Sequence, residues 1–364
     1  MSVDEIISVI EDFAPLSLQE PYDNAGLLVG EREQVVEGAL LCLDVTEEVI
    51  DEAIRKGAGL VIAHHPVIFG GLKKLTGSNF TERVVLKAVR GNISIYAAHT
   101  NIDSVWGGVN SRISAKLGLK NPEILSPADG ILRKLVVFVP KDHAAKVRES
   151  VFKAGAGHIG EYDNCSFNLE GEGSFRGSED SDPFAGKKGD IHFEKEIRVE
   201  TIFPGFLEKR IIESMIRAHP YEEVAYDIYP LKNRWDRAGM GMAGDLERDT
   251  DAVEFLNKLK GIFGVKTIRH SKLPQKQIKR VALCGGSGSS LIDAARKSGA
   301  DIYVSGEFRY HDYFEAGEGM MIADIGHYES ERFTIEIFYE LLTKKFPNFA
   351  VHFSDANTNP IYYF

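Results

Sequence analysis

The chain has 364 residues, of which 43% are hydrophobic and 27% are charged, and its formal net charge at pH 7 is -11. This length is too great for one ordinary hydrophobic core and allows two or three domains. The negative charge argues against nucleic acid as the main partner, because a phosphate backbone attracts clustered Lys and Arg. No apolar run approaches the roughly 20 residues that span a bilayer, so we expect no membrane partner.

The cysteines and the first residues bear on the cellular compartment. Cys42, Cys165 and Cys284 are odd in number, far apart and without a CxxC spacing, so they predict no disulfide framework. Residues 1–6 show no basic region followed by an apolar stretch, and we expect no signal peptide. Both observations predict a cytoplasmic protein.

The first third of the chain alternates predicted strands and helices. Thr46 followed by two glutamates is typical of a helix start, and Gly57 of a helix end. The alternation indicates βαβ units and a largely parallel sheet. We expect strands over 39–44, 60–63 and 93–98, and helices over 46–56 and 81–90.

The last third repeats this design. A gap-free alignment at an offset of 242 residues places Leu41–His65 on Leu283–Glu307, with seven identities in 25 positions and the same strand–helix–strand pattern. We interpret the two regions as related α/β lobes. The pair His64-His65 falls on Gly306 and Glu307, so we expect an asymmetric site between the lobes.

The middle of the chain predicts an inserted domain of another kind. Its elements follow the order βαββαβ, which is the ferredoxin-like arrangement of an α+β domain. A stretch over 171–189 is rich in Gly, Ser and charge, and it predicts a mobile hairpin or loop. The predicted strands cover 135–139, 164–169, 191–203 and 223–229, and the predicted helices cover 143–154 and 206–218. The α/β fold is therefore expected to comprise a first lobe (1–126), an insert (127–231) and a second lobe (232–364), the two lobes forming one domain.

Two adjacent histidines follow the predicted strand over 60–63. Side chains of successive strand residues diverge, so His64 and His65 serve two metal ions more naturally than one. The alternative is one histidine held by a carbonyl and one in solvent. His99 and Asp103 follow the next strand in the same way. Asp103 is either a metal ligand or the residue of a helix N-cap or Asx-turn, and His99 is either a ligand or a group that holds Asp103 or a metal-bound water.

A third strand end carries His327 and Glu331, four residues apart at the start of a helix predicted over 331–345. One helical turn places both side chains on one face, where they can reach the same ion, and a Glu can bridge two ions. The alternative is a carboxylate that interacts with the helix dipole. Glu307 and His311 repeat the spacing and are candidates for an acid/base pair, further site residues or surface groups.

Counted together, three histidines and two carboxylates suit two divalent ions of the Zn, Mn or Fe kind. Two such ions would activate a water molecule and stabilise a displacement at a carbonyl, amidine or phosphoryl centre. The glycine-rich residues 285–289 follow a predicted strand, where they either cradle a phosphate or form a plain tight turn, the interpretation we favour.

Five segments of the chain resemble one family, the Nif-three-like dinuclear metal-centre proteins, which are also labelled GTP cyclohydrolase I type 2 homologs. The segments are Tyr22–Gly30, Ala63–Pro66, His99–Asp103, Gly306–Asp312 and Gly326–Glu331. The residues 219–226 resemble the PII/CutA-like insert of its longer bacterial members. The resemblance implies that His64, His65, Asp103, His327 and Glu331 are the metal ligands, with Glu331 as the bridge, and that the chain forms a homohexamer.

Two functions follow as expectations. The first is a metal-dependent hydrolase that acts on a small molecule such as a nucleotide, with His99 or His311 as the proton shuttle and Glu307 as a further catalytic candidate. The second is a non-catalytic metal-binding or regulatory assembly in which the insert senses a ligand. No clear basic motif for a nucleotide phosphate lies near the predicted ligands.

Overall fold

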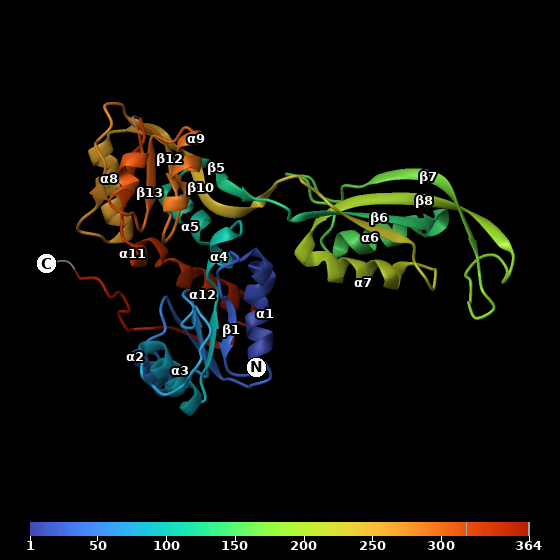
Figure 1. Ribbon diagram of the computed structural model, residues 1–364, viewed down its shortest axis with the longest axis horizontal. Coiled ribbons are helices and arrows are strands. Elements are labelled where there is room, and N and C mark those ends of the chain that lie inside the picture. The colour runs from blue at the N-terminus through green and yellow to red at the C-terminus, as the bar shows by residue number, and fades with distance from the viewer. Residues whose placement is uncertain (318, 363–364) are drawn as a thin grey trace. The chain divides into compact units, whose positions relative to one another are not determined.

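The structure is a computed structural model that describes residues 1–317 and 319–362. Its internal contacts divide the chain into two compact units (Figure 1). The first unit combines Met1–Pro127 with the chain from Arg237 onward, and the second is Ala128–Asp236. Among the described residues, no helix has both the length and the apolar character needed to cross a bilayer.

The first sheet of the first unit is largely parallel, as expected. Its strand order is β1-β4-β3-β2-β15, and only β1 runs antiparallel to its neighbour. Helix α2 begins where the Thr46 hydroxyl accepts a hydrogen bond from the Val49 N–H group, and it ends at Gly57, which is left-handed with φ 68°. The strands are β1 (Gly26–Val29), β2 (Gly38–Cys42), β3 (Leu60–Ala63), β4 (Ser94–Ala97) and β15 (Ala350–Phe353), and the helices α2 (Glu47–Lys56) and α3 (Phe80–Arg90) lie among them in the chain.

The second sheet of the same unit has the order β11-β14-β13-β12-β10-β5, with β12, β13 and β14 parallel to one another. The offset of 242 residues places β3 on β13, and helix α9 (Ile292–Lys297) connects β12 to β13 as α2 connects β2 to β3. The strands are β5 (Lys120–Ala128), β10 (Trp235–Thr250), β11 (Arg269–His270), β12 (Ile278–Leu283), β13 (Ile302–Ser305) and β14 (Met321–Asp324).

One hydrophobic cluster joins the two sheets. It includes Leu41 and Ile62 of the first sheet, Val281 and Val304 of the second, and buried residues of four longer helices and of one short helix. The removal of these side chains from water is the main force that holds the sheets in one unit. The four helices are α1 (Val3–Phe13), α5 (Val109–Leu117), α8 (Ala252–Phe263) and α12 (Thr334–Lys345), and three short helices, α4 (Thr100–Ser104), α10 (Asp312–Glu315) and α11 (His327–Glu331), follow strand ends.

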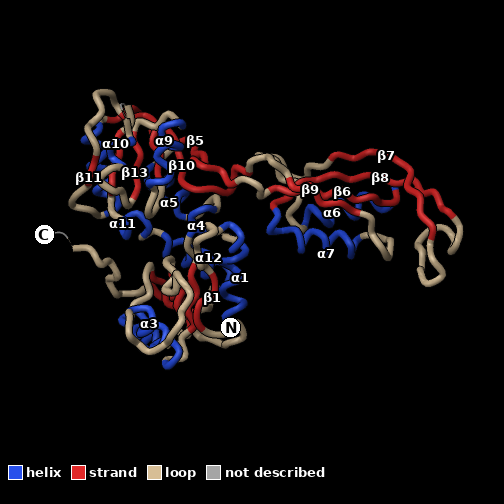
Figure 2. The backbone as a smooth tube through the Cα atoms, viewed as in Figure 1, coloured by secondary structure: helices blue, strands red, loops and turns tan. Residues whose placement is uncertain are grey.

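The second unit is a four-stranded antiparallel sheet with two helices on one face (Figure 2). The elements occur in the order β6, α6, β7, β8, α7, β9, while the sheet order is β7-β8-β6-β9. Buried side chains such as Val137, Val199 and Met215 form its core. The elements are β6 (Leu132–Pro140), α6 (Ala144–Lys153), β7 (Phe167–Arg176), β8 (Ile191–Pro204), α7 (Glu208–Ala218) and β9 (Tyr226–Pro230).

The stretch over 171–189, which was expected to be a mobile hairpin or loop, belongs to the β7–β8 hairpin but begins with strand residues. Strand β7 continues to Arg176, and its glycines pair with β8, Gly171 opposite Glu196 and Gly173 opposite Glu194. The low strand propensity of glycine made this stretch resemble a loop, but a complete hydrogen-bonded partner strand overrides that propensity.

Candidate metal centre

Strand β3 delivers His64 and His65 to the carboxyl edge of the first sheet. Their backbone N–H groups bond to the carbonyls of Cys42 and Leu43, so the chain still follows β2 at this point. The two rings then diverge. His64 is wholly buried and its Nδ1 lies 2.9 Å from the Ala98 carbonyl, whereas the Nδ1 of His65 lies 2.8 Å from Asp44 Oδ1.

These contacts decide which ring nitrogen faces the site. A carbonyl or a carboxylate can only accept a hydrogen bond, so Nδ1 carries a proton and Nε2 faces the site, where it presents a lone pair whenever the ring is neutral. The same arrangement recurs at His99, whose Nδ1 lies 2.8 Å from Asp23, and at His327, whose Nδ1 lies 3.1 Å from Glu307. An acceptor on the far nitrogen is the usual support of a metal-binding histidine.

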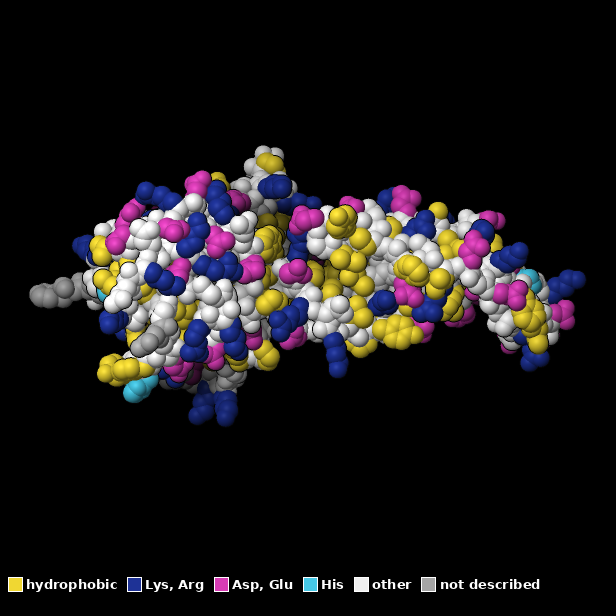
Figure 3. Space-filling view, turned by 90° about the horizontal axis from the view of Figure 1, so that it is seen from above, with side chains coloured by type: hydrophobic (Ala, Val, Ile, Leu, Met, Phe, Trp, Pro, Cys, Tyr) yellow, Lys and Arg dark blue, Asp and Glu magenta, His cyan; other side chains and the backbone are white. Residues whose placement is uncertain are grey.

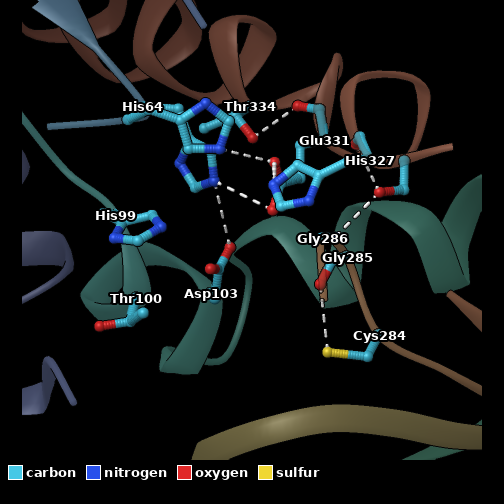
Figure 4. A network of polar contacts seen from close by, with 12 residues as sticks. His64, His99, Thr100, Asp103, Cys284, Gly285, Gly286, His327, Glu331 and Thr334 are labelled. Carbon is cyan, nitrogen blue, oxygen red and sulfur yellow. Dashed lines mark hydrogen bonds and ion pairs between the residues drawn. The ribbon is translucent and has the colours of Figure 1, made fainter. Parts of the chain in front are cut away.

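Glu331 lies among the rings of His64, His65 and His327, and Figure 4 shows it beside His64 and His327. Its Oε1 is 3.4 Å from Nε2 of His64, and its Oε2 is 2.9 Å from Nε2 of His65 and 3.2 Å from Nε2 of His327. The side chain is almost completely buried, with 3% exposed. The two carboxylate oxygens therefore face different histidines: Oε1 faces His64, and Oε2 faces His65 and His327.

Asp103 completes the arrangement from helix α4. Its Oδ1 lies 3.8 Å from Nε2 of His64, and both atoms are buried without a hydrogen-bond partner in the described structure. Asp103 is not a helix N-cap: it lies inside α4, and Gly108 precedes α5. His64, Asp103 and Glu331 thus direct three electron-pair donors at one another, an arrangement that a cation would stabilise and that is costly without one.

The donor atoms form three overlapping groups, each with its atoms within 4.8 Å of one another. Glu331 belongs to two of these groups. Imidazole nitrogens and carboxylate oxygens suit borderline divalent ions, so the residues fit the expected kind of metal. The groups are His64–Asp103–Glu331, His65–His327–Glu331 and His64–His65–His99.

The pKa values reflect the crowding of these groups. Burial disfavours the charged imidazole of His65, but its hydrogen bonds to Asp44 and Glu331 outweigh burial and raise its pKa to about 10. Burial and the charge of Glu331 raise the pKa of Asp103 to about 8. Burial opposes ionisation of Glu331 too, but attraction to His64 and hydrogen bonds from His327 and His65 hold its pKa well below its usual range.

Two glycines leave the space that the site needs. A Cβ atom on Gly286 would lie 2.1 Å from Glu331 Oε1, and one on Gly306 would lie 2.5 Å from Ser330 Oγ and 2.7 Å from the Cα atom of His327. The N–H groups of Gly285 and Gly286 donate to Asn110 and Ser330, so they are used within the fold. This supports the plain turn over the phosphate cradle for residues 285–289.

His99 lies beside the predicted ligands and is linked to Asp23. The Asp23 carboxylate also accepts hydrogen bonds from the backbone and hydroxyl of Thr100. Burial would raise the pKa of Asp23, but these bonds and the one to His99 lower it to about 2. An ionised Asp23 therefore fixes the ring of His99, whose centroid is 5.4 Å from that of His64 and 5.5 Å from that of His65.

The other two catalytic candidates lie apart from the centre of the site. Glu307 holds Nδ1 of His327, and 60% of its side chain is exposed. His311 is exposed beside Tyr310 and Phe314, and it belongs to none of the groups of potential ligands among the described residues. The helix predicted over 331–345 is split into α11 and α12, and the Thr334 hydroxyl donates to the Glu331 carbonyl at the break.

Asp44 and Asp23, which hold His65 and His99, were not predicted as site residues. Asp44 follows the end of β2 as His64 follows β3, so its place at a strand end was a usable signal. Asp23 lies in a loop, and no spacing relates it to His99. Thr358 is more remote still: its hydroxyl donates to Asp44 Oδ2 at 3.0 Å from 314 residues away.

The chain is similar over most of its length to known proteins. The family Duf34/NIF3 (NGG1p interacting factor 3) matches residues 1–360. A Halalkalibacterium halodurans protein named GTP cyclohydrolase 1 type 2 homolog is 42% identical over 324 residues, which are 88% of this chain and 87% of that protein. A Bacillus subtilis protein of the same name is 39% identical and covers 98% of this chain and 97% of its own length.

Solved structures extend the comparison to the fold. A Bacillus cereus protein described as related to NIF3 has a TM-score of 0.88 at 38% identity and covers 100% of this chain and 99% of its own. A Staphylococcus aureus protein has a TM-score of 0.77 at 28% identity, with the same coverage. With a family match over residues 1–360 and relatives that align almost end to end, the chain belongs to the Duf34/NIF3 family.

Proposed function

We propose that the site binds two divalent metal ions that share Glu331. His64 and Asp103 would hold one ion, and His65 and His327 the other. The observation that carries this proposal is the division of the Glu331 oxygens, with Oε1 toward His64 and Oε2 toward His65 and His327. A carboxylate can bind one ion through each oxygen, which an imidazole ring held through Nδ1 cannot do.

We infer that the reaction is hydrolysis. Two bound ions would supply an activated water and stabilise the charge that develops at the reacting centre. His99 would move a proton at its Nε2, because Asp23 holds its Nδ1 and orients the ring. Asp44 and Glu307 would orient His65 and His327 through their Nδ1 atoms.

The substrate class we propose is a nucleotide or a related small molecule. The support is the name of the curated relatives, GTP cyclohydrolase 1 type 2 homolog. GTP is therefore the first substrate to test, followed by other nucleotides and phosphoesters.

The test begins with protein stripped by a chelator and reloaded with Zn, Mn or Fe. We expect turnover that is absent in the stripped protein and returns with the metal. His99→Ala should lower turnover by about 10²–10⁴-fold if the ring moves a proton in the rate-limiting step. If metal-replete protein of the correct assembly turns over none of the panel, the hydrolase proposal fails and the metal-binding regulatory assembly becomes the better account.

We further propose that the two α/β regions are related lobes, that Ala128–Asp236 is a PII-like insert of ferredoxin-like topology, and that the chain forms a homohexamer. The matching strand–helix–strand order supports the relation of the two lobes. The element order of the second unit supports the ferredoxin-like insert. The hexamer rests on the family resemblance. Light scattering of the purified chain should give six times the mass of one chain, and the mass of a monomer or dimer would contradict it.

A further inference from the structure

The second unit contains a pocket of about 780 Å³, far larger than a single ion needs and within the range of small-molecule sites. It opens on the sheet face opposite the helices. Val137 and Val199 point into the core with the helices, so the alternating neighbours Phe138 and Arg198, which line the pocket, point to the other face. Hydrophobic side chains gather on this unit in the view from above (Figure 3).

Four aromatic side chains line the pocket, and three of them, Tyr221, Phe175 and Phe184, have their rings close together. The centroid of the Tyr221 ring lies 5.8 Å from that of Phe175 and 6.1 Å from that of Phe184, with interplanar angles of 61° and 47°. The rings are therefore inclined to one another rather than stacked. The face of an aromatic ring is its negative side, which attracts a cation.

Glu196 adds a carboxylate to the lining beside Tyr221. Its Oε1 accepts a hydrogen bond from the Tyr221 hydroxyl at 3.0 Å. A Cβ atom on Gly173 would lie 2.3 Å from its Oε2, so the glycine leaves the space into which the carboxylate extends. Within the described part of the chain, no Lys or Arg forms an ion pair with Glu196.

The wider lining has an acidic balance. Five glutamates and two arginines line the pocket, and one of the arginines, Arg198, already pairs with Glu200 at 2.9 Å. An anionic ligand would meet an excess of carboxylates here. A ligand with a positive charge and an apolar body would instead satisfy both the carboxylate and the rings.

We propose that this pocket binds a small organic cation, an ammonium group with apolar substituents. Tyr221, Phe175 and Phe184 would contact its apolar and cationic surface, and Glu196 would balance its charge. The proposal concerns a site within the second unit and does not depend on the function of the metal centre.

The test compares choline with 3,3-dimethyl-1-butanol, in which carbon replaces the nitrogen and the charge is lost at nearly constant shape. Isothermal titration calorimetry of the full chain should show choline binding about tenfold more tightly than the neutral alcohol. Adenosine monophosphate serves as an anionic probe with an aromatic base, and it should bind more weakly than choline.

Variants assign the binding to this pocket. Glu196→Gln keeps an oxygen for the Tyr221 hydroxyl and should weaken choline binding by about tenfold. Phe184→Leu changes a ring that is 54% exposed, so the fold should persist while affinity falls by about two- to fivefold. Phe193→Leu is the matched control, a 62% exposed ring on β8 that is outside the lining. Equal binding of the neutral alcohol, preferred binding of the anion, or unchanged affinity in both pocket variants would overturn the proposal.

Discussion

The first unit contains two strand–helix–strand segments, β2–α2–β3 and β12–α9–β13. They carry different residues at their equivalent strand ends. At the end of β3 stand His64 and His65, and at the equivalent end of β13 stand Gly306 and Glu307. The first pair directs two Nε2 atoms at Glu331. Gly306 has no side chain to contribute. The space that a side chain would fill is occupied by Ser330 and the backbone of His327.

The same contrast holds one strand earlier. The offset of 242 residues places Asp44, which follows β2, on Gly286, which follows β12. Asp44 holds Nδ1 of His65, whereas Gly286 gives room to Glu331 Oε1. At these two positions the first segment contributes a side chain, His64 or Asp44, where the second has a glycine, and the result is one asymmetric site between the two sheets.

The strands β4 and β14, which follow these two segments in the chain, end in more similar residues. Both β4 and β14 are followed by a histidine and then, four residues later, by a carboxylate: His99 with Asp103, and His327 with Glu331. Both carboxylates approach Nε2 of His64, at 3.8 Å and 3.4 Å. The two regions therefore have matching residue types after β4 and β14, whereas after the other strands the second region has glycines where the first has side chains.

The largest effect should come from Glu331→Gln, which removes the carboxylate that contacts His64 and His65 of the first segment as well as His327. The amide cannot provide two anionic oxygens, so we expect both ions to bind more than about a hundredfold more weakly. Elemental analysis after dialysis against buffered metal measures this, with Glu340→Gln on α12 as the control because its partner is Arg112 on the surface. Two ions held as tightly as in the unchanged chain would rule out the bridge.

Gly306→Ala tests whether the space at β13 is required. The new Cβ atom would lie 2.5 Å from Ser330 Oγ and 2.8 Å from the Gly326 carbonyl, so helix α11 must shift. We expect a loss of about 1–3 kcal/mol in the free energy of unfolding, measured in urea, together with weaker metal binding. The control is Gly261→Ala in α8, where an added Cβ meets no atom within 4 Å and stability should not fall. Equal stability of the two variants would show that the space is incidental.

The helices of the two strand–helix–strand segments also differ: α2 has Glu52 at the position where α9 has Ala294. Glu52 accepts hydrogen bonds from Ser354 at 2.6 Å and from the Asp355 N–H at 2.9 Å, and it pairs with Lys56. Burial would raise its pKa, but these bonds outweigh burial and lower the pKa to about 2. Ionised Glu52 thus anchors the segment that leads to Thr358.

Because the pKa of Glu52 is lower in the folded chain than its usual value of 4.5, its contribution is complete above about pH 5 and is lost as the pH falls toward 2. Glu52→Gln should therefore lower the free energy of unfolding by on the order of 2 kcal/mol at neutral pH. The difference from the unchanged chain should shrink below pH 5. Urea unfolding at several pH values measures it, with the exposed Glu48→Gln as control. A difference that is independent of pH would contradict this assignment.

The smallest effect should follow Thr358→Val, which removes only the hydroxyl that donates to Asp44. Asp44 then holds His65 less firmly, and we expect the affinity for one ion to fall by about tenfold while the other ion is unaffected. Competition with a chelating dye resolves the two affinities. Thr343→Val, whose hydroxyl bonds within α12, should change neither. A uniform loss of both ions would show that the C-terminal segment supports the whole fold rather than His65.

Much of the fold was predictable because its signals are local. Thr46 and Gly57 gave both ends of α2, and the apolar run over 60–63 gave β3. The three strand ends identified the residues that the structure brings together, although their role as ligands stays a prediction. The break between α11 and α12 was not predicted, because it depends on the Thr334 hydroxyl rather than on a helix-breaking residue.

The residues that hold the histidines in place could not be found from such local signals. Asp23 and His99 are 76 residues apart, and Thr358 and Asp44 are 314 apart, so only the folded chain reveals these pairs. Glu307 was noted for its spacing to His311, but its contact is with Nδ1 of His327. Spacing along one segment identifies side chains on a shared face and does not show which of them meet across two sheets.

The central claim, one carboxylate between two ions, is tested most directly by a crystal structure of metal-loaded protein with anomalous scattering measured at the metal edge. The account predicts two anomalous peaks in each chain, roughly 3.5–4 Å apart, one beside His64 and Asp103 and the other beside His65 and His327, with Glu331 in contact with both. A single peak, or two peaks of which only one contacts Glu331, would contradict it.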